Sequence, residues 1–170
     1  MNSNYLSLFM LMLVLLCFQA CGGGGSGQLQ AQQQKTAVIS FSTVSLDATA
    51  PIRGIVLEAV LPSGISVATK AGSNEIESGV LQGMNGYAYT GTYSATGRKI
   101  ILASPSISPS NIPLGVFATL TCTVNSGYTL TESQFSSIVP VDFQVTGPSG
   151  IDLTAAAQPV TLKTTAQFGY

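Results

Sequence analysis

Three tyrosines in one short stretch are the side chains best able to bind a ligand in this sequence. Residues 84–94 read MNGYAYTGTYS, and Tyr87, Tyr89 and Tyr93 all point to one side if this stretch is a β-strand. On an exposed sheet such a row is a stacking platform for sugar rings or for the apolar surface of a protein partner. The alternative is that the tyrosines fill the core and the other side of the strand faces water. That other side carries small residues: Ala88, Thr90, Thr92 and Ser94.

Side chains for catalysis and metal binding are scarce. The chain has no His, the commonest general base and a common metal ligand, and only 8% of its residues are charged. A glycosidase would need two of the few carboxylates to face one another across a cleft. Glu75 and Glu77 could offer oxygen ligands to Ca²⁺ from one loop, although a solvated loop is the simpler explanation. We therefore expect no enzymatic activity, no cofactor and no metal site.

The distribution of charge argues against a nucleic-acid partner. The formal net charge is −1, and among the six Lys and Arg residues only Arg98 and Lys99 are adjacent. Binding to a phosphate backbone requires a clustered basic face. The scattered cations therefore predict that the chain does not bind nucleic acid.

The N-terminal residues have the pattern of an export signal. Residues 6–18, LSLFMLMLVLLCF, form an apolar run. A membrane-spanning helix needs about 20 such residues, so this run fits the hydrophobic part of a signal peptide better. Cys21 follows Gln19-Ala20 and precedes the tract GGGGSG at 22–27. This pattern resembles the lipobox of a bacterial lipoprotein, in which the cysteine becomes the new N-terminus and carries acyl chains such as palmitate.

The lipobox resemblance implies a division of the N-terminal part of the chain. It implies a signal peptide at 1–20, with lipid attachment at Cys21. The Gly/Gln-rich residues 21–35 would be a tether that holds the following domain away from the membrane. Gly22 takes the place of the Asp that retains such lipoproteins at the inner membrane, so the outer membrane is the expected location. An ordinary secretory signal or a short plasma-membrane anchor is the alternative.

Residues 36–170 have the pattern of a single all-β domain. Apolar and polar residues alternate in runs bounded by Gly, Pro, Ser and Asn, which is typical of an antiparallel β-sandwich. A capping-box pattern at 131–134 predicts one short helix through Phe135, and residues 95–98 predict a hairpin turn. The strand at 139–145 is expected to place Val139, Val141, Phe143 and Val145 on one face. The predicted strands are 37–44, 52–61, 65–68, 86–94, 99–103, 115–124, 139–145 and 160–165.

Cys122 lies in the predicted strand at 115–124. The cysteines at 17 and 21 belong to the signal and the anchor, so Cys122 has no intramolecular disulfide partner. It is expected to act as a small buried hydrophobe rather than a reactive thiol. Alternation predicts that it shares a buried face with four neighbours: Val116, Ala118, Leu120 and Val124.

The order of these features resembles a cohesin-like domain of the carbohydrate-binding-module β-sandwich superfamily. The likeness rests on hydrophobic patterning and turn spacing over most of residues 36–170. It implies a jelly-roll or cohesin-like sandwich whose partner surface is a broad sheet face. The segments that carry it are 54–57 (GIVL), 61–67 (LPSGISV), 115–124 (GVFATLTCTV), 127–130 (GYTL) and 135–138 (FSSI).

These patterns predict a lipid-anchored, extracytoplasmic binding or adaptor module whose ligand is a protein or a polysaccharide. One alternative is a carbohydrate-binding module that uses the tyrosine platform. Another is a structural lipoprotein of the cell envelope with no small ligand. The exposure of the tyrosine row distinguishes the first alternative from the second.

Replacing Cys21→Ser should release the protein from the membrane fraction or block its processing, because serine cannot carry the thioether-linked lipid. Fractionation of cells that express the wild type and the variant measures this. A serine variant that is cleaved and stays membrane-bound like the wild type would contradict the lipid anchor.

Overall fold

The computed structural model describes residues 35–44, 51–104, 111–156 and 159–169. The predicted signal peptide at 1–20, the attachment residue Cys21 and the tether up to residue 34 lie outside them. The described residues belong to one compact unit, Gln34–Tyr170. Within them, no helix is long and apolar enough to cross a membrane.

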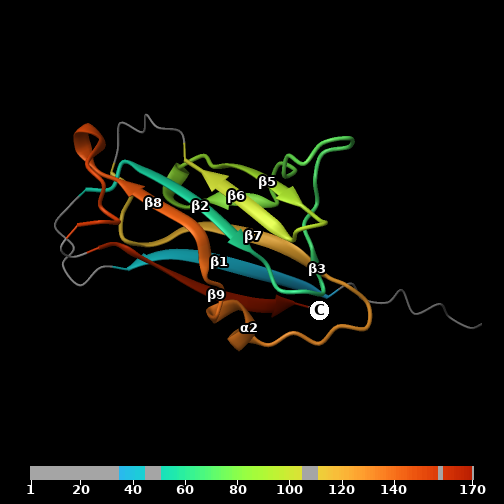
Figure 1. The fold of residues 1–170 in the computed structure, drawn as a ribbon. Coiled ribbons are helices and arrows are strands. Elements are labelled where there is room, and N and C mark those ends of the chain that lie inside the picture. The colour runs from blue at the N-terminus through green and yellow to red at the C-terminus, as the bar shows by residue number, and fades with distance from the viewer. Residues whose placement is uncertain (1–34, 45–50, 105–110, 157–158, 170) are drawn as a thin grey trace, which may run out of the picture. The chain divides into compact units, whose positions relative to one another are not determined.

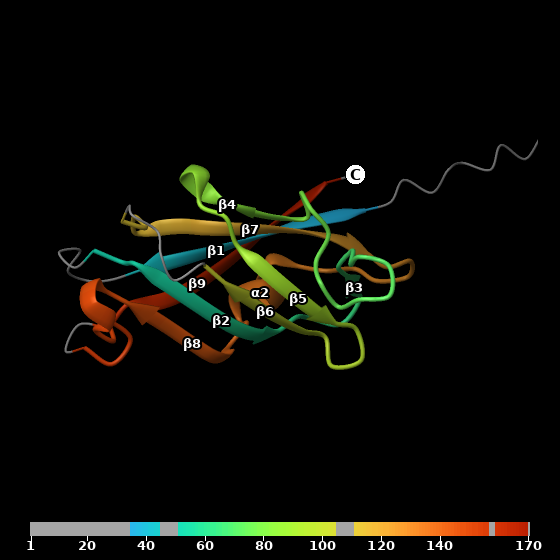
Figure 2. The same cartoon turned by 90° about the horizontal axis from the view of Figure 1, so that it is seen from above.

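Two antiparallel sheets pack face to face, which confirms the predicted all-β sandwich (Figures 1 and 2). One sheet has the order β3-β7-β1-β9, and β4 also pairs with β7; we call it the first sheet. The second sheet has the order β5-β6-β2-β8. The strands are β1 (Thr36–Val44), β2 (Gly54–Val60), β3 (Ile65–Ser66), β4 (Leu81–Gly83), β5 (Thr90–Ser94), β6 (Lys99–Ala103), β7 (Gly115–Val124), β8 (Pro140–Thr146) and β9 (Thr161–Gly169).

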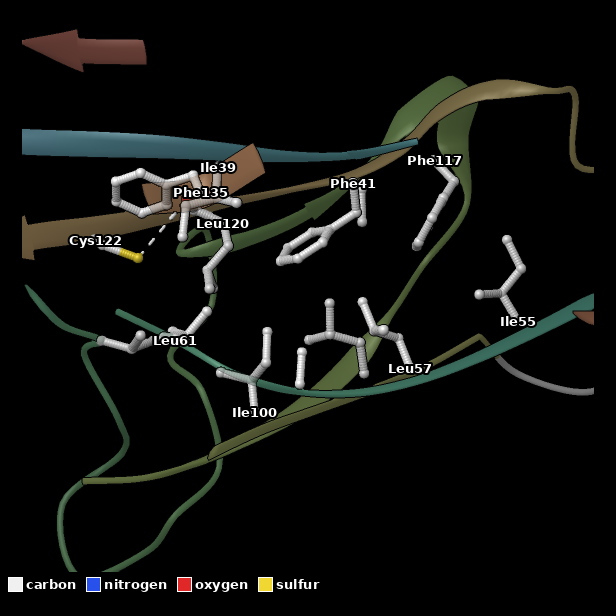
Figure 3. Close-up of a cluster of buried hydrophobic side chains, with 14 of the residues drawn as sticks. Ile39, Phe41, Ile55, Leu57, Leu61, Ile100, Phe117, Leu120, Cys122 and Phe135 are labelled. Atoms are coloured by element: carbon white, nitrogen blue, oxygen red, sulfur yellow. Dashed lines mark hydrogen bonds between the residues drawn. The ribbon is translucent and has the colours of Figure 1, made fainter. Parts of the chain in front are cut away.

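Alternation along the strands supplies the apolar layer between the sheets. Every second residue of β1, β2 and β6 is buried, and these residues are almost all aliphatic or aromatic. Figure 3 shows Ile39, Phe41 and Leu120 of the first sheet pointing toward Leu57 and Ile100 of the second. Burying one such side chain contributes about 1.5–3 kcal/mol to the free energy of folding. The core therefore provides the main stabilisation of the sandwich.

The short predicted helix is present and closes the layer beside β9. Helix α2 (Glu132–Ser136) begins with a capping box, in which the Gln134 side-chain oxygen accepts a hydrogen bond from the Thr131 backbone N–H at 2.8 Å. Phe135 projects from the helix into the core and is fully buried. The Thr164 hydroxyl of β9 donates a hydrogen bond to the Phe135 carbonyl. A buried threonine thus ties the helix to the sheet.

One end of β7 departs from the predicted face. Val116 was expected in the core with Ala118, but Val116 is exposed and Phe117 is buried in its place. The cause is a register shift against β1 between Phe41 and Ser42. A β-bulge of this kind adds one residue to a strand and exchanges the two faces beyond it. Phe117 thereby brings its ring to the core.

The first half of β8 also departs from prediction. Val145 is buried as expected, whereas Val139 and Val141 are 77% and 62% exposed. The pairing of β8 with β2 shifts between Glu58 and Ala59, so Val141 has no partner residue on β2. The regular alternation of valines in the sequence therefore does not produce a regular buried face.

Two further differences concern residues 81–94. Strand β4 was not predicted, because three residues are too few for a period-2 pattern. Strand β5 begins at Thr90 rather than Gly86, since residues 84–86 form a 3-10 turn, η1 (Met84–Gly86). Asn85 in that turn has a φ of 57°, which is incompatible with an extended strand.

Cys122 should resist thiol reagents in the folded protein. Its side chain is 1% exposed, and burial raises the pKa of the thiol to about 12. The thiol therefore stays protonated while the pH rises from about 7 to about 9, a range in which an exposed thiol ionises. Labelling should be slow and almost independent of pH, and fast once denaturant is added. Rapid labelling of the native protein that accelerates with pH would contradict this burial.

Candidate binding surfaces

Tyr93 faces the core, which is one of the two orientations that the sequence left open for the tyrosine row. Tyr93 is 4% exposed, and its hydroxyl donates to the Ile65 carbonyl at 3.5 Å. Thr90 and Thr92, on the other face of β5, are exposed. Burial is the main reason why the pKa of Tyr93 is raised, so its phenol stays neutral. The sandwich needs the bulk of the ring inside, and threonine hydroxyls lose no hydrogen bonds when they face water.

Tyr87 and Tyr89 pack against the core and are only partly exposed. The Tyr89 ring packs against Phe117 with centroids 5.7 Å apart. Its hydroxyl is buried with no hydrogen-bond partner among the described residues, and burial raises the pKa of this phenol to about 12. The Tyr87 hydroxyl donates to the Asn111 carbonyl. A Cβ at Gly83 would lie 2.8 Å from the Tyr89 ring, so these rings are closely packed. Their part in ligand binding stays a prediction.

The outer face of the second sheet carries both apolar and polar side chains. Register places Ile101 of β6 between Thr92 of β5 and Glu58 of β2. Ile101 is 38% exposed although it lies on an inner strand. The Lys99 ammonium lies 2.6 Å from the Glu58 carboxylate, which balances the charge of that carboxylate. An apolar side chain at the centre of a sheet face, with polar neighbours around it, is typical of a protein-binding surface.

A second candidate lies at the end of the domain where β1 begins. A groove of about 130 Å³ is lined by Tyr128 and Phe168, with Lys35 at its border. Tyr128 is 48% exposed, and its ring lies against Gly64, where a Cβ would approach it to 2.2 Å. Gly64 has a φ of +89°, so only glycine meets both the steric and the backbone requirement. No sequence pattern pairs Gly64 with Tyr128, which is why sequence reasoning missed this groove.

Two of the remaining carboxylates make local contacts on the surface. Glu75 forms an ion pair with Lys70 on an exposed loop. Asp152 accepts a hydrogen bond from the Thr154 backbone N–H at 2.8 Å, and its bonds to Thr154 lower the pKa of the carboxyl group. Among the described residues, no three His, Cys, Asp or Glu side chains gather as metal ligands would.

Comparison with known proteins adds no functional assignment: no protein-family model, curated protein or solved structure matches the chain. Within the described residues, we therefore argue function from the outer face around Ile101 and from the groove beside Tyr128.

Tyr93→Ala should destabilise the domain strongly, because removing a buried aromatic ring leaves a cavity. We expect the free energy of unfolding to fall by about 3–5 kcal/mol, as for other large aromatic truncations. The matched control is Tyr128→Ala, whose ring is half exposed and should cost less than half as much. Denaturant unfolding of both variants measures the difference. A Tyr93→Ala protein as stable as the wild type would contradict the inward orientation of the row.

Proposed function

We propose that this chain is a lipid-anchored, extracytoplasmic adaptor module that binds a protein partner through the outer face of its second sheet. The pattern at Cys21 supports the anchor and the outer-membrane location. The two-sheet architecture is compatible with the resemblance to cohesin-like domains, in which a sheet face rather than a deep pocket receives the partner. The domain itself would perform no chemistry.

The observation that carries this proposal is the exposure of Ile101 on an inner strand. Neighbouring strands pair with both edges of an inner strand but do not cover its outer face. An apolar side chain on that face therefore meets solvent unless another molecule covers it. Around it lie hydroxyl groups of β5 and the ion pair of Lys99 with Glu58. Such a surface suits a partner that contributes apolar contact and hydrogen bonds, with little electrostatic steering.

Carbohydrate binding is the second candidate, and the groove beside Tyr128 favours it. Two aromatic rings, Tyr128 and Phe168, border a small depression on an uncharged part of the surface, except for Lys35. Aromatic faces stack well on sugar rings. This version of the carbohydrate hypothesis uses Tyr128 in place of the inward-facing Tyr93.

A photo-reactive amino acid at position 101 tests the adaptor proposal in intact cells. It should yield one discrete protein adduct, whereas the same group at Val116 should not. Val116 is the matched control, because it is 37% exposed on the first sheet. The protein identified from the adduct is then purified and its affinity for the wild type is measured.

Ile101→Lys should weaken that affinity by at least about tenfold, which corresponds to about 1.4 kcal/mol. The wild-type affinity should change little between about 0.1 M and about 1 M salt, over which the screening length falls from about 10 Å to about 3 Å. Equal adducts at both positions, or unchanged binding by Ile101→Lys, would contradict the assignment of this face. Oligosaccharide binding that Tyr128→Ala abolishes would establish the second candidate instead.

A further inference from the structure

The groove beside Tyr128 lies where the chain enters the domain. Lys35, the first described residue, borders the groove, and its carbonyl accepts a hydrogen bond from the Val124 N–H at 2.7 Å. Gly169, the last described residue, also borders it and pairs with Thr36 of β1. The start of β1 and the ends of β7 and β9 therefore meet at one end of the domain, which we call the entry end.

Two aromatic rings are exposed at the entry end, and backbone hydrogen bonds and ring packing hold them there. Tyr128 and Phe168 are 48% and 38% exposed. The Tyr128 N–H donates to the Asn125 carbonyl at 3.2 Å, and the Asn125 N–H donates to the Gly64 carbonyl at 2.8 Å. The Phe168 ring meets Phe135 edge-on, with centroids 5.7 Å apart. Both rings are therefore presented to the outside from an ordered backbone.

The chemistry of the groove suits a lipid surface. Tyrosine is enriched at membrane interfaces, because its ring is apolar while its hydroxyl remains hydrated. Phe168 and Leu130 add apolar area beside the Tyr128 ring. Lys35 is the only charged side chain among the described residues that line the groove. A cation is attracted to anionic lipid headgroups, and no carboxylate of this lining repels them.

The segment between the proposed anchor and the domain favours a lipid surface as the occupant. Thirteen residues, none of them charged, separate Cys21 from Lys35. Even a fully extended segment of this length spans at most about 50 Å. The membrane that holds the anchor would thus stay within that distance of the entry end, and its contact with the groove would be intramolecular, at high effective concentration. Any other ligand would have to reach the groove from solution.

We propose that the entry end rests on the lipid surface that holds the anchor, with the rings of Tyr128 and Phe168 in the interfacial region. This inference rests on the lipid anchor of the proposed function but not on the Ile101 face. The membrane would occupy the groove and so exclude the sugar-binding candidate. The opposite end of the domain, where the 3-10 turn η2 (Pro148–Gly150) follows β8, would point away from the membrane (Figures 1 and 2).

Quenching of a fluorescent label by lipids tests this placement in the full, lipidated chain. The chain is inserted into vesicles of phosphatidylethanolamine and phosphatidylglycerol that carry a nitroxide on the headgroup. A label on Ser126→Cys, in the exposed turn that holds Tyr128, should be quenched strongly. A label on Ser149→Cys, exposed in η2, is the matched control and should be quenched little. Cys122 is buried and should not take up the label.

Flotation of the same vesicles distinguishes this proposal from the anchor on which it rests. Vesicles that float with the protein but show equal quenching at both positions, or none at position 126, would overturn the proposal and leave the anchor intact. A wild-type chain that does not float with the vesicles would refute the anchor and this proposal with it. An unquenched label at position 126 whose emission changes when an oligosaccharide is added would assign the groove to sugar binding instead.

Tyr128→Asp, combined with the label at position 126, provides a second measurement. It should lower the quenching by at least about twofold, because a carboxylate is costly to bring into contact with anionic lipids. Val116→Asp is the matched control for a new surface charge, since Val116 is exposed near the other end of β7, and it should leave the quenching unchanged. Thermal melts establish that both variants fold. A folded Tyr128→Asp chain that is quenched like the wild type would overturn the proposal.

Discussion

The apolar layer between the two sheets determines which side of each strand is available for function. With 8% charged residues and no Trp, the chain relies on aliphatic side chains and a few aromatic rings for its core. Phe41, Phe117 and Phe135 are buried there almost completely. Tyr93 joins them, because its strand has no other bulky side chain to offer. The outward faces are consequently left with hydroxyl groups, amides and isolated apolar residues such as Ile101.

Strand existence could be predicted from the sequence more reliably than strand orientation. The bounds of β6 and β7 agree with the predicted strands, because each is a clear period-2 run between turn residues. The capping box of α2 is also a local pattern, and the sequence predicted it correctly. Bulges are different. The shifts near Phe41 and Glu58 depend on the partner strand, so the exchange of faces at Phe117 and Val141 leaves no mark in the sequence itself.

For the candidate sites too, the sequence shows which residues are present but not which way they face. A row of tyrosines is visible in the sequence, but whether it faces core or solvent depends on how the sheets pack. Ile101 lies between Ile100 and Leu102, and only the packing of the two sheets shows that it is the one of these three directed outward. Tyr128 is brought to Gly64 by a turn far away in the sequence. The proposed binding function would therefore depend on tertiary arrangement, which the sequence alone does not show.

The inward orientation of the tyrosine row is the most direct consequence of this packing, and nitration of tyrosines in the native protein measures it. Reaction with tetranitromethane, followed by mass spectrometry of peptides, reports the modification of each ring separately. We expect Tyr128, which is 48% exposed, to react early, and Tyr93, which is 4% exposed, to react only after unfolding. Nitration of Tyr93 at the same rate as Tyr128 in folded protein would show that the row faces solvent and that the sheets do not pack as described.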